Sequence, residues 1–361
     1  MIQTSFLQTL LDQLSQDDVS DIHLSPHAAI WLRRSGDMEP LLGSEHLSTP
    51  AEITSWLSAV RYQSSTLYEL IAAKGGQDDF AINLGELRVR MHVYISSGEV
   101  NVAVRKLAFH IPPLPSLGLP AGVNKLLDHP TGLVLVVGGT GSGKTTTLAS
   151  CLDQINASLS GHIITLEDPI EYLHKDKRCR VRQRQVGEGH DCLSFAGGVV
   201  AAMREDPDII MVGEVRDQQT MQACLAAAQT GHFVVATLHT NSSTEAIERV
   251  LAFYPEKERD LARSVLSSTL RGVIAQRLIK ANAGGRVLAA ELLLCTPAIR
   301  SNIATGQLIS IEQSMETGRS EGQITMNFSL QKLFESGLIS RDAALTASSK
   351  RDHLEKRLGG S

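Results

Sequence analysis

A glycine-rich run in the middle of the chain matches the loop that nucleotide-hydrolysing proteins use to hold phosphate groups. It fits the pattern GxxxxGK(S/T) at every fixed position, with an apolar run before it and a helical pattern after it. In such a loop the glycines let backbone N–H groups turn inward around phosphate oxygens, and the following helix directs its positive end at the same anion. The run consists of Gly138, Gly139, Thr140, Gly141, Ser142, Gly143, Lys144 and Thr145.

Two side chains of this loop predict an ATP site that also uses Mg²⁺. We expect Lys144 to reach the β- and γ-phosphates and the Thr145 hydroxyl to bind the metal. Hydrolysis further requires an acid on the metal side and a group that orients the attacking water.

A carboxylate that follows an apolar run at 209–212 is the candidate for orienting water. Gly213 stands where an acid is usual, so this role falls to Glu214. Ligands of open α/β sheets bind at the C-terminal edge, where the end of such a strand would lie. A solvated glutamate at a strand end is the alternative, and the spacing alone favours neither.

Two more strand ends carry side chains that suit phosphate chemistry. Glu167 and Asp168 directly follow an apolar run, and carboxylates there can hold Mg²⁺ through water. His239 follows another run and is placed to sense the γ-phosphate. A lone histidine is more often structural, so this residue alone would carry little weight.

Buried strands alternating with helices must bring these residues together. Strands that are apolar throughout are typical of parallel sheets covered on both faces, and helical patterns separate them here. We therefore predict a parallel α/β fold around strands at 133–137, 163–166, 209–212 and 233–236.

Residues 87–107 predict a β-hairpin with one buried face. Apolar residues alternate along both arms, and Ser97-Gly98 supplies the turn. This register places Arg90 opposite Arg105, with Arg88 on the same polar face. Like charges directly opposed across strands are destabilising, and a phosphate held by both forks would offset them. The alternative is that both arginines are solvated.

A proline-rich break in the pattern of helices and strands predicts two domains. Prolines between Pro112 and Pro120 indicate a linker. We expect an N-terminal domain at 1–108, a linker at 109–120 that acts as a hinge, an ATP-binding domain with C-terminal helices at 121–361, and a fraying tail after about residue 348. The net charge of −5 disfavours a nucleic-acid partner, and the scattered cysteines disfavour a zinc site. The N-terminus lacks the pattern of a signal peptide, so we expect the chain to be cytoplasmic.

Beyond the phosphate loop, further motifs lie at 20–24, 165–171, 204–217 and 230–240. Through them the chain resembles the secretion ATPase superfamily and, within it, the pilus-retraction (PilT-like) branch, and the last three motifs look like the Asp box, the Walker B block and the His box of that superfamily. The resemblance implies a smaller N-terminal α+β (PAS-like) domain, a RecA-like P-loop core, and a homohexamer with ATP and Mg²⁺ between subunits. It also implies N-terminal arginines that reach the nucleotide and a peripheral position on an inner-membrane platform protein.

Departures from the family pattern bear on which branch the chain belongs to. A tetracysteine segment, usual in assembly and type II secretion ATPases, is missing after 275–278, which favours retraction. Residues 298–303 only partly match the retraction signature, however, so an assembly or secretion ATPase of a specialised pilus or conjugation system is the alternative. A DNA translocase is a rival function, but it should show a basic or aromatic groove, which the net charge of −5 and the 4% aromatic content disfavour. A non-hydrolysing scaffold is another rival, but it should lack the catalytic candidates that this chain carries.

Overall fold

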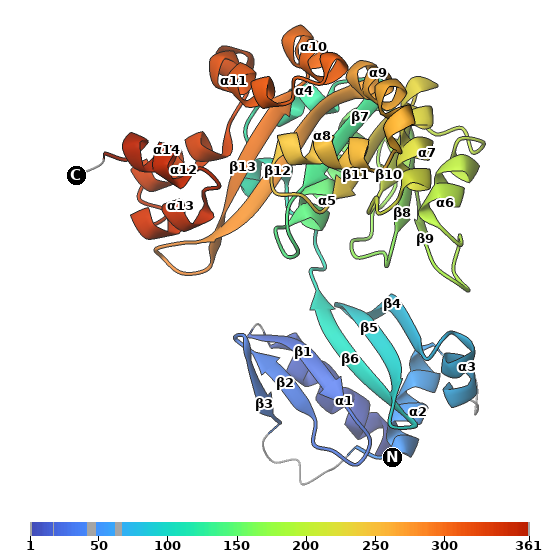
Figure 1. Ribbon diagram of the computed structural model, residues 1–361. Helices are drawn as coiled ribbons and strands as arrows, with labels where there is room; N and C mark the ends of the chain where they lie inside the picture. Colours follow the sequence, from blue (N-terminus) through green and yellow to red (C-terminus); the bar gives the residue numbers. More distant parts are fainter. Residues whose placement is uncertain (1, 17, 42–47, 62–66, 360–361) are drawn as a thin grey trace. The chain divides into compact units, whose positions relative to one another are not determined.

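The computed structural model describes residues 2–16, 18–41, 48–61 and 67–359. These residues form two compact units, which Figure 1 draws as ribbons. Unit 1 comprises Met1–His110 together with Asp168–Leu173, and unit 2 comprises Ile111–Glu167 together with His174–Ser361. No sequence pattern indicated that the short segment after residue 167 would group with the N-terminal residues.

Unit 1 is a six-stranded antiparallel sheet with helices on one face. The helices pack on the face that carries the apolar residues of the strands, because successive side chains of a strand point to opposite faces. The strand order is β3-β2-β1-β6-β5-β4. The elements are α1 (Ile2–Ser15), β1 (Val19–Leu24), β2 (Trp31–Arg34), β3 (Asp37–Pro40), α2 (Pro50–Val60), α3 (Leu67–Ala73), β4 (Gln77–Leu84), β5 (Leu87–Ser96) and β6 (Glu99–Leu107).

The predicted hairpin is confirmed as β5 and β6. Ser97 and Gly98 have φ values of 53° and 79°, as a two-residue type I′ turn requires. The register pairs Arg90 with Arg105, and the alternate residues Val89 and Met91 are fully buried in the core of the unit.

Unit 2 is built around a seven-stranded sheet in the order β13-β12-β7-β11-β10-β8-β9. All neighbouring strands are parallel except β12 and β13, which form an antiparallel pair at one edge. The predicted parallel α/β fold is therefore confirmed. The strands are β7 (Gly132–Val137), β8 (Gly161–Glu167), β9 (Cys179–Gln185), β10 (Ile209–Val212), β11 (Phe233–Leu238), β12 (Leu270–Lys280) and β13 (Arg286–Leu294).

Helices cover both faces of this sheet and create two apolar cores. One core lies under η1 (Leu114–Leu117), α4 (Val123–Leu127) and α5 (Lys144–Ser158). The other lies under α6 (Phe195–Ala202), α7 (Gln218–Gln229), α8 (Ser243–Ala252), α9 (Arg259–Thr269), α10 (Pro297–Thr305) and α11 (Ile309–Thr317). Two short 3₁₀ turns, η2 (Glu256–Glu258) and η3 (Gly318–Glu321), complete this part of the described chain.

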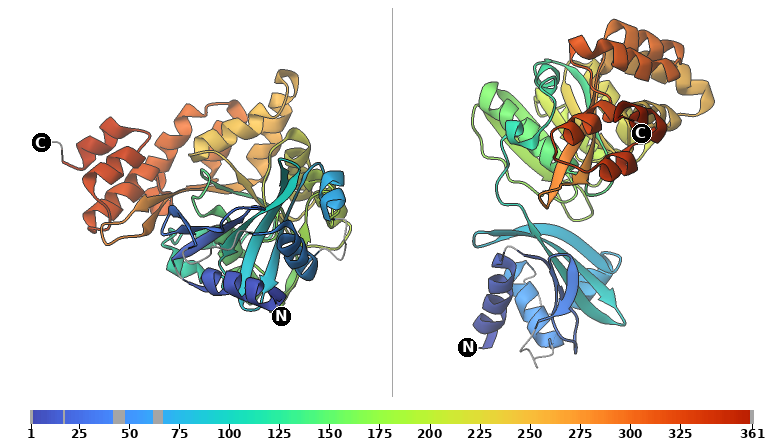
Figure 2. Two further views of the ribbon diagram at one scale, coloured as in Figure 1. Left: turned by 90° about the horizontal axis from the view of Figure 1, so that it is seen from below. Right: turned by 90° about the vertical axis from the view of Figure 1, so that its left-hand side faces the viewer.

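The last helices form a group of their own on the β12–β13 ribbon, as Figure 2 shows. They are α12 (Met326–Glu335), α13 (Arg341–Ala347) and α14 (Arg351–Arg357). The expectation that the tail frays after residue 348 is wrong for the described part, because Leu354 of α14 is fully buried in this apolar group.

The proline-rich stretch packs on unit 2. Leu114 is buried in its core, and the Ser150 hydroxyl donates to the Pro112 carbonyl at 2.7 Å. The chain first passes from unit 1 to unit 2 between His110 and Ile111, and it passes between the units again on either side of Asp168–Leu173. The domain and linker boundaries given above stay a prediction. In the part of the chain that the structure describes, no helix is both long and apolar enough to cross a membrane.

Candidate nucleotide site

The residues singled out for phosphate chemistry gather at one edge of the unit 2 sheet. Strands β7, β11, β10 and β8 are parallel neighbours, so their C-terminal ends lie at the same edge. The glycine-rich loop follows β7 and His239 follows β11. Glu214 comes after β10 with one residue between them, and Glu167 is the last residue of β8.

The glycine-rich loop folds tightly, and its backbone leaves little room for side chains. A Cβ at Gly138 would lie 2.4 Å from the Ser142 hydroxyl and 2.6 Å from the Gln276 carbonyl oxygen. Gly143 has a φ of 91° and caps the start of α5, whose first residue is Lys144. The helix N-terminus therefore follows directly on the loop, which is the arrangement that favours an anion.

Two polar groups of the loop fit a bound phosphate. The Lys144 ammonium donates to the loop's own carbonyls, at 2.8 Å for Gly138 and 3.0 Å for Gly139. Burial lowers the pKa of Lys144, although the charge of Glu214 opposes that shift. The Ser142 hydroxyl is buried and has no hydrogen-bond partner in the described chain. An anionic ligand in the loop would offset the buried charge and supply acceptors.

Gln276 supports this loop, and the sequence analysis gave it no role. It lies on β12, the parallel neighbour of β7, and is 1% exposed. Its side-chain N–H donates to the Ser142 carbonyl at 2.7 Å, across 134 residues of sequence. The amide thus holds the loop one residue before Gly143. Spacing along the chain could not reveal this, because the contact depends on which strand lies beside β7.

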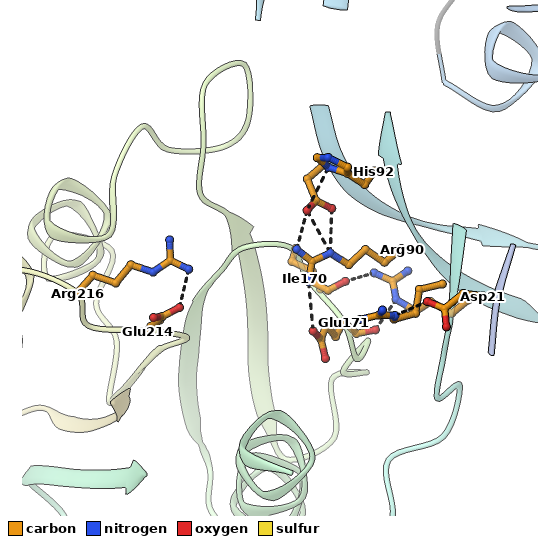
Figure 3. Close-up of polar contacts among 10 residues, drawn as sticks. Asp21, Arg90, His92, Ile170, Glu171, Glu214 and Arg216 are labelled. Carbon is orange, nitrogen blue, oxygen red and sulfur yellow. Dashed lines mark hydrogen bonds and ion pairs between the residues drawn. The ribbon is translucent and has the colours of Figure 1, made fainter. Parts of the chain in front are cut away.

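Glu214 is the centre of a small charged network beyond β10. His239 Nε2 lies 3.0 Å from one carboxylate oxygen, and Arg216 Nη2 donates to the other at 2.7 Å, as Figure 3 shows for Arg216. Burial alone would raise the pKa of Glu214, but the Arg216 hydrogen bond and the charges of Arg216, His239 and Lys144 lower it below the usual value. The carboxylate is therefore fixed and ionised, as an acceptor for a water proton must be.

Glu167 and Asp168 are neighbours in sequence but differ in their surroundings. Glu167 is 6% exposed, and one of its oxygens accepts hydrogen bonds from Thr165 at 2.6 Å and Gln183 at 2.9 Å. Asp168 is exposed and groups with unit 1. Among the described residues, no three His, Cys, Asp or Glu side chains converge on one point that could hold a metal. Thr145 is exposed in the first turn of α5.

The opposed arginines of unit 1 have carboxylate partners, so the argument that they need a phosphate is wrong. Arg90 forms a close pair with Asp79 of β4, with a shortest distance of 2.6 Å (Figure 3). Arg105 pairs with Asp21 of β1, also at 2.6 Å. Strands on either side of the hairpin therefore supply the counter-charges. The Arg105 side chain is still 65% exposed, whereas that of Arg90 is 34% exposed.

Arg88 holds backbone of the Asp-box segment within unit 1. Its guanidinium donates to the carbonyls of Ile170 and Glu171 and, at 2.8 Å, to the Asn83 side chain. The residue is 6% exposed, and each of its three side-chain nitrogens donates to one of these acceptors. A role for Arg88 and Arg90 at the nucleotide stays a prediction.

Comparison with known proteins decides the family. The family described as Type II/IV secretion system protein matches residues 2–285. The chain belongs to this family. An Escherichia coli (strain K12) protein, "Uncharacterized protein YggR", is 40% identical over 316 residues, covering 87% of this chain and 94% of that one. "Type IV pilus retractation ATPase PilT" of Pseudomonas aeruginosa is 38% identical over 338 residues, covering 93% and 96%.

A solved structure agrees with these relatives over nearly the whole chain. It is described as the pilus retraction motor PilT with bound ADP, is 40% identical, and superposes with a TM-score of 0.88 while covering 97% of this chain and 98% of that one. Because the chain belongs to this family and has an intact phosphate loop, it is a P-loop ATPase. The predicted secretion ATPase fold is confirmed.

Proposed function

We propose that the chain is the ATPase of a type IV pilus or a related secretion machine, with pilus retraction as the favoured task. The observation that carries the proposal is that the phosphate loop and the Glu214–His239 pair lie at the same edge of the unit 2 sheet. Relatives named for pilus retraction cover almost the full chain and support the choice of machine.

ATP would lie in the loop 138–145, with Lys144 turned from the loop carbonyls onto phosphate oxygens. Mg²⁺ would be held by Thr145 and, through water, by Glu167 or Asp168, and when bound it neutralises charge on the phosphates. Glu214 accepts a proton from the attacking water, and His239 keeps the carboxylate in position.

The assembly we propose is a homohexamer in the cytoplasm, peripheral to the inner membrane. Each ATP would lie between subunits, and hydrolysis would release the two units of a subunit to turn about the predicted hinge in the linker at 109–120. The turning units would pull on an inner-membrane platform protein. No nucleic acid is expected as a partner, given the net charge of −5.

Of the three predicted unit 1 arginines, Arg105 has the most exposed side chain, so we choose it to test the predicted contact with a nucleotide. Replacing Arg105 with Ala should lower ATP turnover about tenfold while ATP affinity changes little, since one charge-assisted hydrogen bond to the transferring phosphate would be lost. Phosphate release and equilibrium ATP binding measure the two effects. A matched variant, Arg34→Ala, also removes an ion-paired arginine of unit 1 and should keep wild-type turnover. Equal rates in both variants would remove Arg105 from the site.

The proposed machine is tested by deleting the gene in its native host and observing pilus dynamics. We expect pili to form but to shorten no longer, and the wild-type gene, but not a Lys144→Ala copy, to restore shortening. Purified wild-type protein should form rings of six subunits in electron micrographs with ATP present. Loss of pilus formation or of secretion would assign the ATPase to assembly or export. An unaffected host together with monomeric particles would contradict the proposal.

A further inference from the structure

Two arginines of unit 2 meet far from the nucleotide site. Arg271 is the second residue of β12, and Arg300 lies in α10. The start of β12 lies beside the start of β7, because Leu270 pairs with Leu133. The phosphate loop follows the other end of β7, about 20 Å away for a strand of 6 residues. Helices α9 and α10 lie side by side here, as Figure 1 shows.

Backbone carbonyls hold both guanidinium groups in place. Arg271 donates from Nε to the Thr131 carbonyl at 2.8 Å and from Nη1 to the Ser268 carbonyl at 2.9 Å. Arg300 donates from Nε to the Cys295 carbonyl and from Nη1 to the same Ser268 carbonyl, each at 3.2 Å. The Nη2 group of each arginine makes no hydrogen bond to the described residues. Fixed guanidiniums with one free nitrogen each need little reorganisation to bind a ligand.

These positive charges lack a counter-charge within the described chain. Neither arginine comes within ion-pair distance of a carboxylate in the residues that the structure describes. Burial and then the charge of Arg300 lower the pKa of Arg271. Burial and then the charges of Arg271 and Arg300 lower the pKa of His129, against the weaker effect of Asp128. The shared Ser268 carbonyl belongs to the last turn of α9, whose partial negative charge offsets only part of this repulsion.

We propose that Arg271 and Arg300 form a binding site for a phosphate dianion. Two arginine forks match the oxygens of a phosphate, and their two charges balance an inorganic phosphate or phosphate monoester near neutral pH. A single carboxylate would balance only one of them. The site is separate from the nucleotide site, because no residue of the phosphate loop takes part.

The test uses the full chain saturated with Mg-ADP, so that the phosphate loop is filled, and inorganic phosphate as the probe. Calorimetric titration should detect phosphate binding to wild-type protein. Arg300→Gln should weaken it at least tenfold, and so should Arg300→Lys, which keeps the charge but loses the fork. The matched control is Arg263→Gln, which removes an arginine of the neighbouring α9 that pairs with Asp260. It should bind phosphate like the wild type.

A second arm distinguishes a soluble phosphate from a lipid headgroup. Vesicles of phosphatidylcholine with phosphatidic acid present the same dianion on a surface. Co-sedimentation with these vesicles that Arg300→Gln abolishes, without binding of free phosphate, would assign the site to a headgroup. Binding of neither probe by folded wild-type protein would overturn the proposal. So would equal binding by the wild type and Arg300→Lys, with thermal melting used to verify that each variant is folded.

Discussion

Replacing Glu214 with Gln should lower the rate of ATP hydrolysis by about 10²–10⁴-fold and leave ATP affinity near the wild-type value. The amide has almost the shape of the carboxylate but cannot take a proton from water. It also loses the charge that Arg216 and His239 face at 2.7 and 3.0 Å. Steady-state phosphate release measures turnover, and binding of a fluorescent ATP analogue measures affinity.

The control for Glu214 is another ion-paired carboxylate of unit 2. Glu355 of α14 pairs with Arg341 at 3.1 Å, and Glu355→Gln removes a charge of the same kind outside the motifs of the nucleotide site. We expect that variant to hydrolyse ATP like the wild type. Unchanged turnover in Glu214→Gln would show that another group orients the water. Because the pKa of Glu214 is lowered, wild-type turnover should persist as the pH falls and be lost only below the usual titration range of a carboxyl group.

Replacing Gln276 with Glu should weaken ATP binding by about a hundredfold at pH 8, corresponding to roughly 3 kcal/mol. An ionised carboxylate cannot donate to the Ser142 carbonyl, and it would place a negative charge beside the phosphate loop. A protonated carboxyl group can donate again, so affinity should recover as the pH is lowered. A defect of packing alone would not depend on pH in this direction. Equilibrium binding of ATP at several pH values measures the effect.

Gln323 provides the matched control for Gln276. It is also a fully buried glutamine of unit 2, and its amide pairs with both backbone groups of Leu294 at 2.7 Å. Gln323→Glu therefore introduces the same buried charge away from the loop. It should lower the melting temperature without a pH-dependent loss of ATP affinity. If the two variants bind ATP equally well at pH 8, Gln276 has no specific role in positioning the loop.

Local patterns in the sequence were sufficient for four strands of the unit 2 sheet, the hairpin register and the loop. Alternation along residues 87–107 reports which side chains are buried, and a two-residue turn then fixes the pairing of Arg90 with Arg105. The phosphate loop is contiguous, so its spacing predicts both its glycines and its helix. Parallel strands place their ends at one edge, which brings His239 within 3.0 Å of Glu214.

Only the tertiary structure decided which partners these side chains have. Asp21 and Asp79 neutralise the hairpin arginines because β1 and β4 flank the hairpin, and no local pattern states which strands are neighbours. Gln276 reaches the loop for the same reason, from a strand more than a hundred residues away in sequence. Periodicity records how far each residue is buried, whereas the order of strands in a sheet depends on the packing of the whole chain.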